Sequence, residues 1–114
     1  MVTESPTQHL HAQCINEVEQ YIREHISEPL NRERLAEVAG FSVPHLHRIF
    51  TAQRGENIAS YVRRVRLERA GRKLRMGAVD ITEVAQAAGY DTHAAFSKAF
   101  KQQYGLSPRE FRQL

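Results

Sequence analysis

The 114-residue sequence lacks the features of several large classes of protein. No apolar run approaches the roughly 20 residues needed to cross a bilayer. The first residues have neither the positive start nor the apolar segment of a signal peptide. Because Cys14 is the single cysteine, an internal disulfide and a CxxC zinc or redox site are excluded. We therefore expect a cytoplasmic protein without a membrane segment.

Motifs of common catalytic sites are also missing. There is no GxSxG, no glycine-rich loop that cradles phosphate, and no Ser, His and Asp set whose proximity the sequence implies. His45 and His47 are two residues apart, so on a helix they do not face each other, and no carboxylate or cysteine completes a ligand set. We expect no enzymatic activity, no bound metal and no cofactor.

Charge is distributed unevenly along the chain. Residues 1–30 contain one basic and five acidic residues, a net charge of −4, whereas residues 31–114 contain 15 basic and 8 acidic residues, a net charge of +7. Residues 61–75, YVRRVRLERAGRKLR, hold seven of the sixteen lysines and arginines. Such a composition is typical of a surface that binds polyanions, although a solvated helix face would also explain it.

The spacing of apolar residues predicts an all-α fold, because no alternating run is long enough for a strand. Helices are expected near residues 8–26, 31–39, 43–53, 57–75, 81–88, 93–103 and 108–113. The polar residues that can cap their N-termini are Asn31, Ser42, Asn57, Asp80 and Ser107. Two stretches, DITE (80–83) and SPRE (107–110), have the pattern of a capping box.

The sequence contains an internal repeat of about fifty residues. AEVAGFS (36–42) corresponds to AQAAGYD (85–91) at an offset of 49. After one extra residue the offset becomes 50, and it pairs Leu46 with Phe96, Phe50 with Phe100, Gly55 with Gly105, and Tyr61 with Phe111. Each copy predicts a short alanine-rich helix, a glycine turn and a second helix, which is a helix-turn-helix unit. An α-solenoid is disfavoured, since such arrays need at least three repeats.

The second helix of each unit has an apolar face and an outward face. At about 100° per residue, Leu46, Ile49 and Phe50 share one side, and Arg48 lies opposite them. In the second copy Lys98 takes the place of Arg48. A protruding helix with a central cation and small neighbours suits the major groove of DNA, although both residues could be ordinary surface cations.

Taken together, these features resemble the DNA-binding domain of the AraC/XylS family of bacterial transcription regulators. The resemblance covers residues 15–113 and depends on ISEPLNRERLAEVAGFSVPHLHRIF, GENIASYVRRVRLERAGRKLR and ITEVAQAAGYDTHAAFSKAFKQQYGLSPREFR. It implies seven helices in two homeodomain-like lobes, residues 1–56 and 76–114, joined by a linker helix at residues 57–75. It also implies two recognition helices, near 43–53 and 93–103, that enter successive major-groove segments of a non-palindromic site, often with bending of the DNA.

Transferred by position, the resemblance also assigns residues to the interface. The base-reading positions fall on Pro44, His47, Arg48, His93, Ala94, Ser97 and Lys98. The phosphate-binding positions are expected at Ser42, Thr51, Thr92 and Lys101. Pro44 and Ala94 depart from a hydrogen-bonding pattern, so they could read only thymine methyl groups or DNA shape.

The resemblance implies partners beyond DNA. A regulator of this kind, most simply an activator, would also contact RNA polymerase and reside in the cytoplasm at the nucleoid. The stretches HLHRIF and YVRRVRLERA are most similar to the branch with a GyrI-like effector-binding domain after the DNA-binding domain. We expect either a stand-alone regulator or such an N-terminal domain, with any effector bound by a domain outside this chain. The alternative function is a helical module that docks on an acidic partner such as RNA polymerase.

Overall fold

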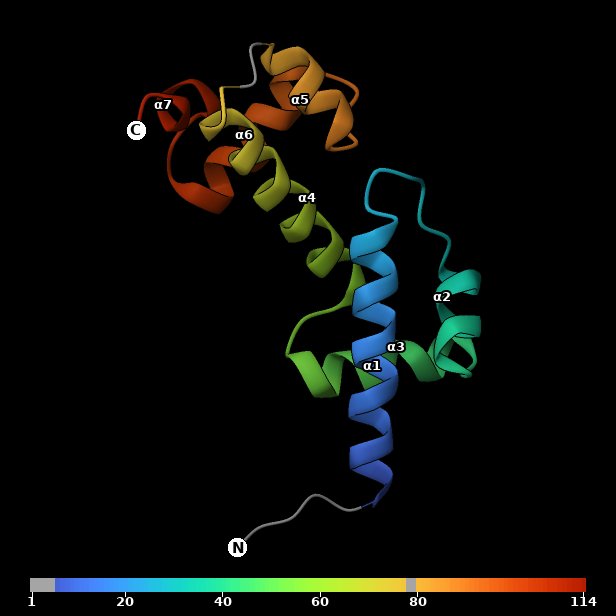
Figure 1. Cartoon of the computed structure of the whole chain (residues 1–114). Helices are drawn as coiled ribbons and strands as arrows, with labels where there is room; N and C mark the ends of the chain where they lie inside the picture. The colour runs from blue at the N-terminus through green and yellow to red at the C-terminus, as the bar shows by residue number, and fades with distance from the viewer. Residues whose placement is uncertain (1–5, 78–79) are drawn as a thin grey trace, which may run out of the picture. The chain divides into compact units, whose positions relative to one another are not determined.

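The computed structural model describes residues 6–77 and 80–114, and over these ranges it contains helices and no strand (Figure 1). The all-α prediction is therefore confirmed. The helices are α1 (Pro6–Glu24), α2 (Arg32–Ala39), α3 (Val43–Arg54), α4 (Ile58–Arg75), α5 (Ile81–Ala87), α6 (His93–Tyr104) and α7 (Pro108–Arg112). None of these described helices is sufficiently long and apolar to cross a bilayer.

The chain divides into two compact units, Met1–Val62 and Arg63–Leu114, and the division falls within α4. The first unit contains α1, α2, α3 and the start of α4. The second contains the rest of α4 with α5, α6 and α7. Each unit therefore has one helix-turn-helix pair, α2 with α3 and α5 with α6.

Residues paired by the sequence repeat occupy equivalent places in the two cores. Leu46 and Phe50 of α3 are fully buried, and so are their counterparts Phe96 and Phe100 of α6. The small residues of the preceding helices are buried in both units, as expected where two helices cross closely. They are Ala36 and Ala39 in α2, Ala85 in α5, and Ala88 at the C-terminal end of α5. The repeat is thus a structural duplication.

The turn of each helix-turn-helix pair contains a glycine in the left-handed region. Gly40 has φ 75° at the end of α2, and Gly89 has φ 90° in the turn after α5. A side chain at either position would be strained, since the left-handed conformation costs an L-residue roughly 1–2 kcal/mol. The turn glycines of the two copies therefore meet the same backbone requirement.

Polar side chains begin the helices largely as the sequence predicts. The Asn31 oxygen accepts hydrogen bonds from the backbone N–H groups of Glu33 and Arg34. Ser107 and Glu110 form a complete capping box at α7. At α5 the Asp80 carboxylate accepts from Thr82 N at 2.8 Å. These caps satisfy N–H groups that have no partner within the helix.

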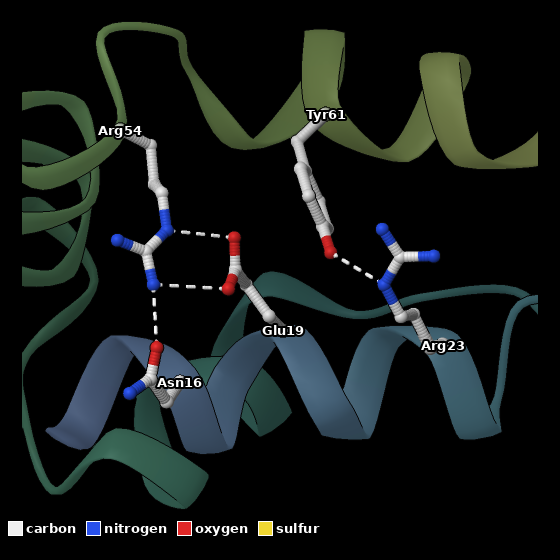
Figure 2. Close-up of polar contacts among 5 residues, drawn as sticks. All are labelled: Asn16, Glu19, Arg23, Arg54 and Tyr61. Atoms are coloured by element: carbon white, nitrogen blue, oxygen red, sulfur yellow. Dashed lines mark hydrogen bonds and ion pairs between the residues drawn. The ribbon is translucent and has the colours of Figure 1, made fainter. Parts of the chain in front are cut away.

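In the first unit, an ion pair holds the C-terminal end of α3 against α1 (Figure 2). Arg54, the last residue of α3, donates from Nε and Nη2 to the two carboxylate oxygens of Glu19 at 2.7 and 3.0 Å. Its Nη2 also donates to the Asn16 oxygen at 2.6 Å. Nearby, Arg23 of α1 donates to the hydroxyl of Tyr61 in α4 at 3.0 Å. Thus α1 fixes both α3 and the start of α4.

The second unit uses aromatic rings in the corresponding places. Tyr104, the counterpart of Arg54, packs with its ring centroid 5.1 Å from that of Phe111 and 4.7 Å from that of Phe100. Gly71 of α4 permits this arrangement, because a Cβ there would lie 3.3 Å from the Phe111 ring. The two units therefore share a fold but are stabilised at this junction by different chemistry.

Candidate nucleic-acid interface

The exposed face of α3 carries the residues predicted to read bases in the first unit. Ser42 precedes the helix, and its hydroxyl oxygen accepts from His45 N at 3.3 Å. Pro44 lies in the first turn, where its missing N–H has no helical partner to lose. Pro44 and Arg48 are exposed and His47 is half-buried, all on the helix that buries Leu46 and Phe50 toward the core.

The equivalent face of α6 is built in the same way. Thr92 begins the helix by accepting from Ala95 N at 3.0 Å. His93, Ala94 and Lys98 are exposed, and Ser97 is half-buried beside them. Both helices therefore present a cation at the same position, Arg48 or Lys98, beside small or polar side chains.

The four residues assigned to phosphate contacts fall at helix starts and on exposed turns. Ser42 and Thr92 are exposed, and each uses its hydroxyl oxygen as the acceptor of a cap bond. A hydroxyl that accepts in this way still has its proton to donate to an anion. Thr51 and Lys101 are exposed and occupy equivalent positions one turn after Arg48 and Lys98. Within each unit, the predicted contact residues thus belong to one helix and its cap.

His45 is separated from His47 by its packing. The His45 ring lies 4.5 Å from the Phe41 ring and 6.1 Å, edge-on, from His11 of α1, measured between centroids. Over residues 6–77 and 80–114, no group of three or more His, Cys, Asp or Glu side chains is arranged to hold a metal ion. His45 therefore helps α1 and the turn after α2 to pack on α3.

Two features of this surface were not predicted from the sequence. The first is the pairing of Arg54 with Glu19, which positions α3 from its C-terminal end (Figure 2). The second is a surface cavity of about 250 Å³ beside α6 that brings Arg109 close to His93 and Ser97. Helix periodicity does not reveal either one, because each depends on residues from different helices. The repeat gave one indication of the cavity, because the basic residue Arg109 is replaced by Ala59 at the corresponding position of the first copy.

The chain is similar to known transcriptional regulators over most of its length. A helix-turn-helix domain model matches residues 35–114. The HTH-type transcriptional regulator GlxA of Rhizobium meliloti is 38% identical over 87 residues, which are 76% of this chain and 27% of GlxA. The regulatory protein SoxS of Salmonella typhimurium is 31% identical over 102 residues, which are 90% of this chain and 95% of SoxS. The chain thus spans about a quarter of one relative and nearly all of another.

Solved structures give the same result. A transcriptional regulator from Chromobacterium violaceum, of the AraC-type DNA-binding domain-containing proteins, superposes with a TM-score of 0.85 at 26% identity, covering 90% of this chain and 91% of that one. The DNA-binding domain of AdpA, solved in complex with a target DNA, superposes with a TM-score of 0.77 at 28% identity, covering 87% and 89%. The chain belongs to the AraC-type helix-turn-helix family of transcriptional regulators.

Proposed function

We propose that this chain is a sequence-specific DNA-binding domain of a transcriptional regulator, with α3 and α6 as its two recognition helices. The observation that carries the proposal is the duplicated exposed face, on which Arg48 and Lys98 occupy equivalent positions above a buried apolar row. The AdpA domain, which shares this fold, was solved with its target DNA. A family of transcriptional regulators also favours DNA binding over catalysis.

In this proposal the two helices insert into successive major-groove segments. Pro44, His47 and Arg48 read bases from α3, and the corresponding bases are read from α6 by His93, Ala94, Ser97 and Lys98. The cap and turn residues Ser42, Thr51, Thr92 and Lys101 contact phosphates. Phosphate contacts supply affinity that depends on salt, whereas base contacts supply specificity.

The test measures binding of the chain to duplex DNA by fluorescence anisotropy over a series of salt concentrations. We expect the logarithm of the association constant to fall linearly with the logarithm of salt concentration. Lysine and arginine side chains that contact phosphates release counterions from the duplex, and added salt opposes this release. Selection of binding sites from a random duplex pool should then return a defined sequence. The proposal fails if no duplex is bound even at low salt.

We also infer a second role, contact with RNA polymerase as part of transcription activation. The supporting observation is the basic composition of α4, on which Arg63, Arg69, Arg72 and Arg75 are exposed. A row of positive charges along a helix is complementary to an acidic protein surface. A promoter-transcription assay tests the role, since charge-reversal of these arginines should lower activation while duplex binding remains. A regulator of this kind acts at the nucleoid, which is the location that the proposal implies.

A further inference from the structure

The cavity beside α6 is lined by residues of three helices in the second unit and by a cap residue. Its lining consists of Ile81 of α5, His93 and Ser97 of α6, and Ser107, Pro108 and Arg109 at the start of α7. The apolar members are Ile81, which is half-buried, and Pro108, which is buried. The polar members, His93, Ser97, Ser107 and Arg109, can all donate hydrogen bonds. Arg109 also supplies a permanent positive charge. The lining therefore suits an oxygen-rich anion.

Its place relative to the recognition helix indicates which anion. His93 and Ser97 lie on one flank of α6, between the buried row of Phe96 and Phe100 and the outward residues Ala94 and Lys98. When a recognition helix lies in the major groove, its exposed face meets base edges, and the protein surface beyond its flank, here the side of α7, meets the sugar-phosphate strand beside the groove. An anion in this cavity would thus belong to the DNA backbone.

Glu110, the acidic residue next to Arg109 in sequence, has partners of its own. The Glu110 carboxylate accepts from Ser107 N at 2.9 Å as part of the capping box. Lys101 of α6 is also close enough to act on Glu110 through its charge. Arg109, by contrast, is exposed and lines the cavity directly. A guanidinium in this position can grip a phosphate with two parallel N–H groups.

The repeat shows that this arrangement is specific to the second unit. At an offset of 50, Arg109 corresponds to Ala59, and Lys101 corresponds to Thr51. The first unit therefore has neither cation where the second has both. Since Lys98 grips a base less specifically than Arg48, a backbone contact would compensate with affinity that does not depend on sequence.

We propose that the cavity between α5, α6 and α7 binds one phosphate of the DNA backbone, with Arg109 as its principal ligand and Ser107 beside it. His93 and Ser97, which border the cavity, keep their proposed role on the base edges and so place this phosphate next to the bases that α6 would read. This inference rests on the proposed function, and it adds a backbone contact that fixes the register of α6 in the groove. It also makes the second unit the stronger electrostatic anchor of the two.

The experiment measures duplex binding over a salt series for the full chain and for Arg109→Ala. We expect the variant to bind both a selected site and a random duplex several-fold more weakly, with a salt slope smaller by about 0.9, the value for one phosphate contact. Arg109→Lys should restore most of the slope. Arg32→Ala removes an exposed arginine of α2, outside the cavity and outside the basic face of α4, and serves as the matched control. Circular dichroism checks that each variant is folded.

Replacing single phosphates of the selected site with uncharged methylphosphonates gives the second readout. One such replacement beside the α6 half-site should weaken DNA binding by the native chain but leave DNA binding by Arg109→Ala unchanged. An unchanged slope for Arg109→Ala, an equal loss for Arg32→Ala, or a methylphosphonate effect that persists in Arg109→Ala would overturn the inference. If the native chain binds no duplex at all, the proposed function itself fails, and the inference fails with it.

Discussion

Arg48 and Lys98 hold equivalent positions on α3 and α6, yet in the proposed function their side chains would recognise DNA differently. A guanidinium is planar and can donate two parallel hydrogen bonds to O6 and N7 of guanine. An ammonium is a compact charge that rotates freely, so it selects an acceptor without a fixed direction. From this difference we expect sharper sequence discrimination in the half-site under α3 than in the half-site under α6.

Arg48→Ala tests the base-reading role. Loss of a bidentate base contact should cost about 1–3 kcal/mol on the selected site and much less on a random duplex. The measurement is competition binding with both duplexes at one salt concentration. Arg48→Lys is the matched control, since it keeps the charge but not the planar fork, and it should retain backbone affinity while losing preference for guanine. Equal losses on both duplexes would show that Arg48 contacts only the backbone.

At the scale of elements, the ends of α3 and α6 are anchored by different interactions. Arg54 reaches Glu19 and Asn16 of α1, whereas its counterpart Tyr104 packs against the tilted rings of Phe100 and Phe111. The hydrogen bond to Glu19 raises the pKa of the Arg54 guanidinium, so this side chain stays charged. The side chains of Arg54 and Glu19 are 27% and 21% exposed, which reduces but does not abolish screening by water. The first unit should therefore be the one whose packing depends on charge.

A double-mutant cycle on Arg54 and Glu19 measures that dependence. We expect Arg54→Ala and Glu19→Gln each to lower the free energy of unfolding by about 1–2 kcal/mol, between the values for exposed and buried pairs. The double variant should lose less than the sum, because the second change removes a partner that is already unpaired. Urea denaturation gives these energies. Strict additivity would mean that the pair contributes no coupling and that α3 is positioned by apolar packing alone.

The capping box of α7 makes an acid-sensitive contribution to stability. The backbone hydrogen bond from Ser107, followed by its side-chain bond, lowers the pKa of Glu110 from its ordinary value of 4.5. A carboxylate with a depressed pKa in the folded state stabilises the fold above its unfolded pKa, and this contribution is lost as the pH falls through the folded value. Melting temperature between pH 6 and 3 should thus decline less steeply for Glu110→Gln than for the native chain.

Ser107→Ala is the control for the pH-dependent contribution of Glu110 to stability. It removes the hydroxyl that accepts from Glu110 N at 3.1 Å but keeps the backbone N–H that Glu110 accepts from. This variant should be less stable at every pH, because it loses an N-cap, yet it should keep most of the acid dependence. If Glu110→Gln and the native chain melt in parallel over this range, the carboxylate makes no such contribution.

The elements were predictable where their signals are local, and the contacts between them were not. Ser42 as an N-cap and the outward position of Arg48 follow from neighbouring residues and the helical period. The turn glycine Gly40 follows from the repeat. The contact of Arg54 with Glu19 joins positions 35 residues apart, and nothing in the neighbouring sequence distinguishes these two from other charged residues. Arg109 likewise gains its meaning only when α7 is folded beside α6.

At the scale of the whole molecule, duplication of the fold has not produced duplication of the surface. The core positions of the two copies are filled alike, with Leu46 and Phe50 matched by Phe96 and Phe100. The outward positions differ at every step, since Pro44, His47 and Arg48 correspond to Ala94, Ser97 and Lys98. Packing constrains the first set, whereas in the proposed function the DNA sequence would constrain the second. If both helices read bases as proposed, the two recognition surfaces of one chain differ, and its target should have two unlike halves.

Binding-site selection with single and double variants tests this division of labour. Selection with Arg48→Ala should lose preference in one block of the site, and selection with Lys98→Ala should lose a weaker preference in another block. Because the two residues lie in separate compact units, their binding losses should add in the double variant. Analytical ultracentrifugation should find one chain per asymmetric site. A palindromic consensus occupied by two chains, or loss of the same block in both variants, would show that one helix-turn-helix pair reads the whole target.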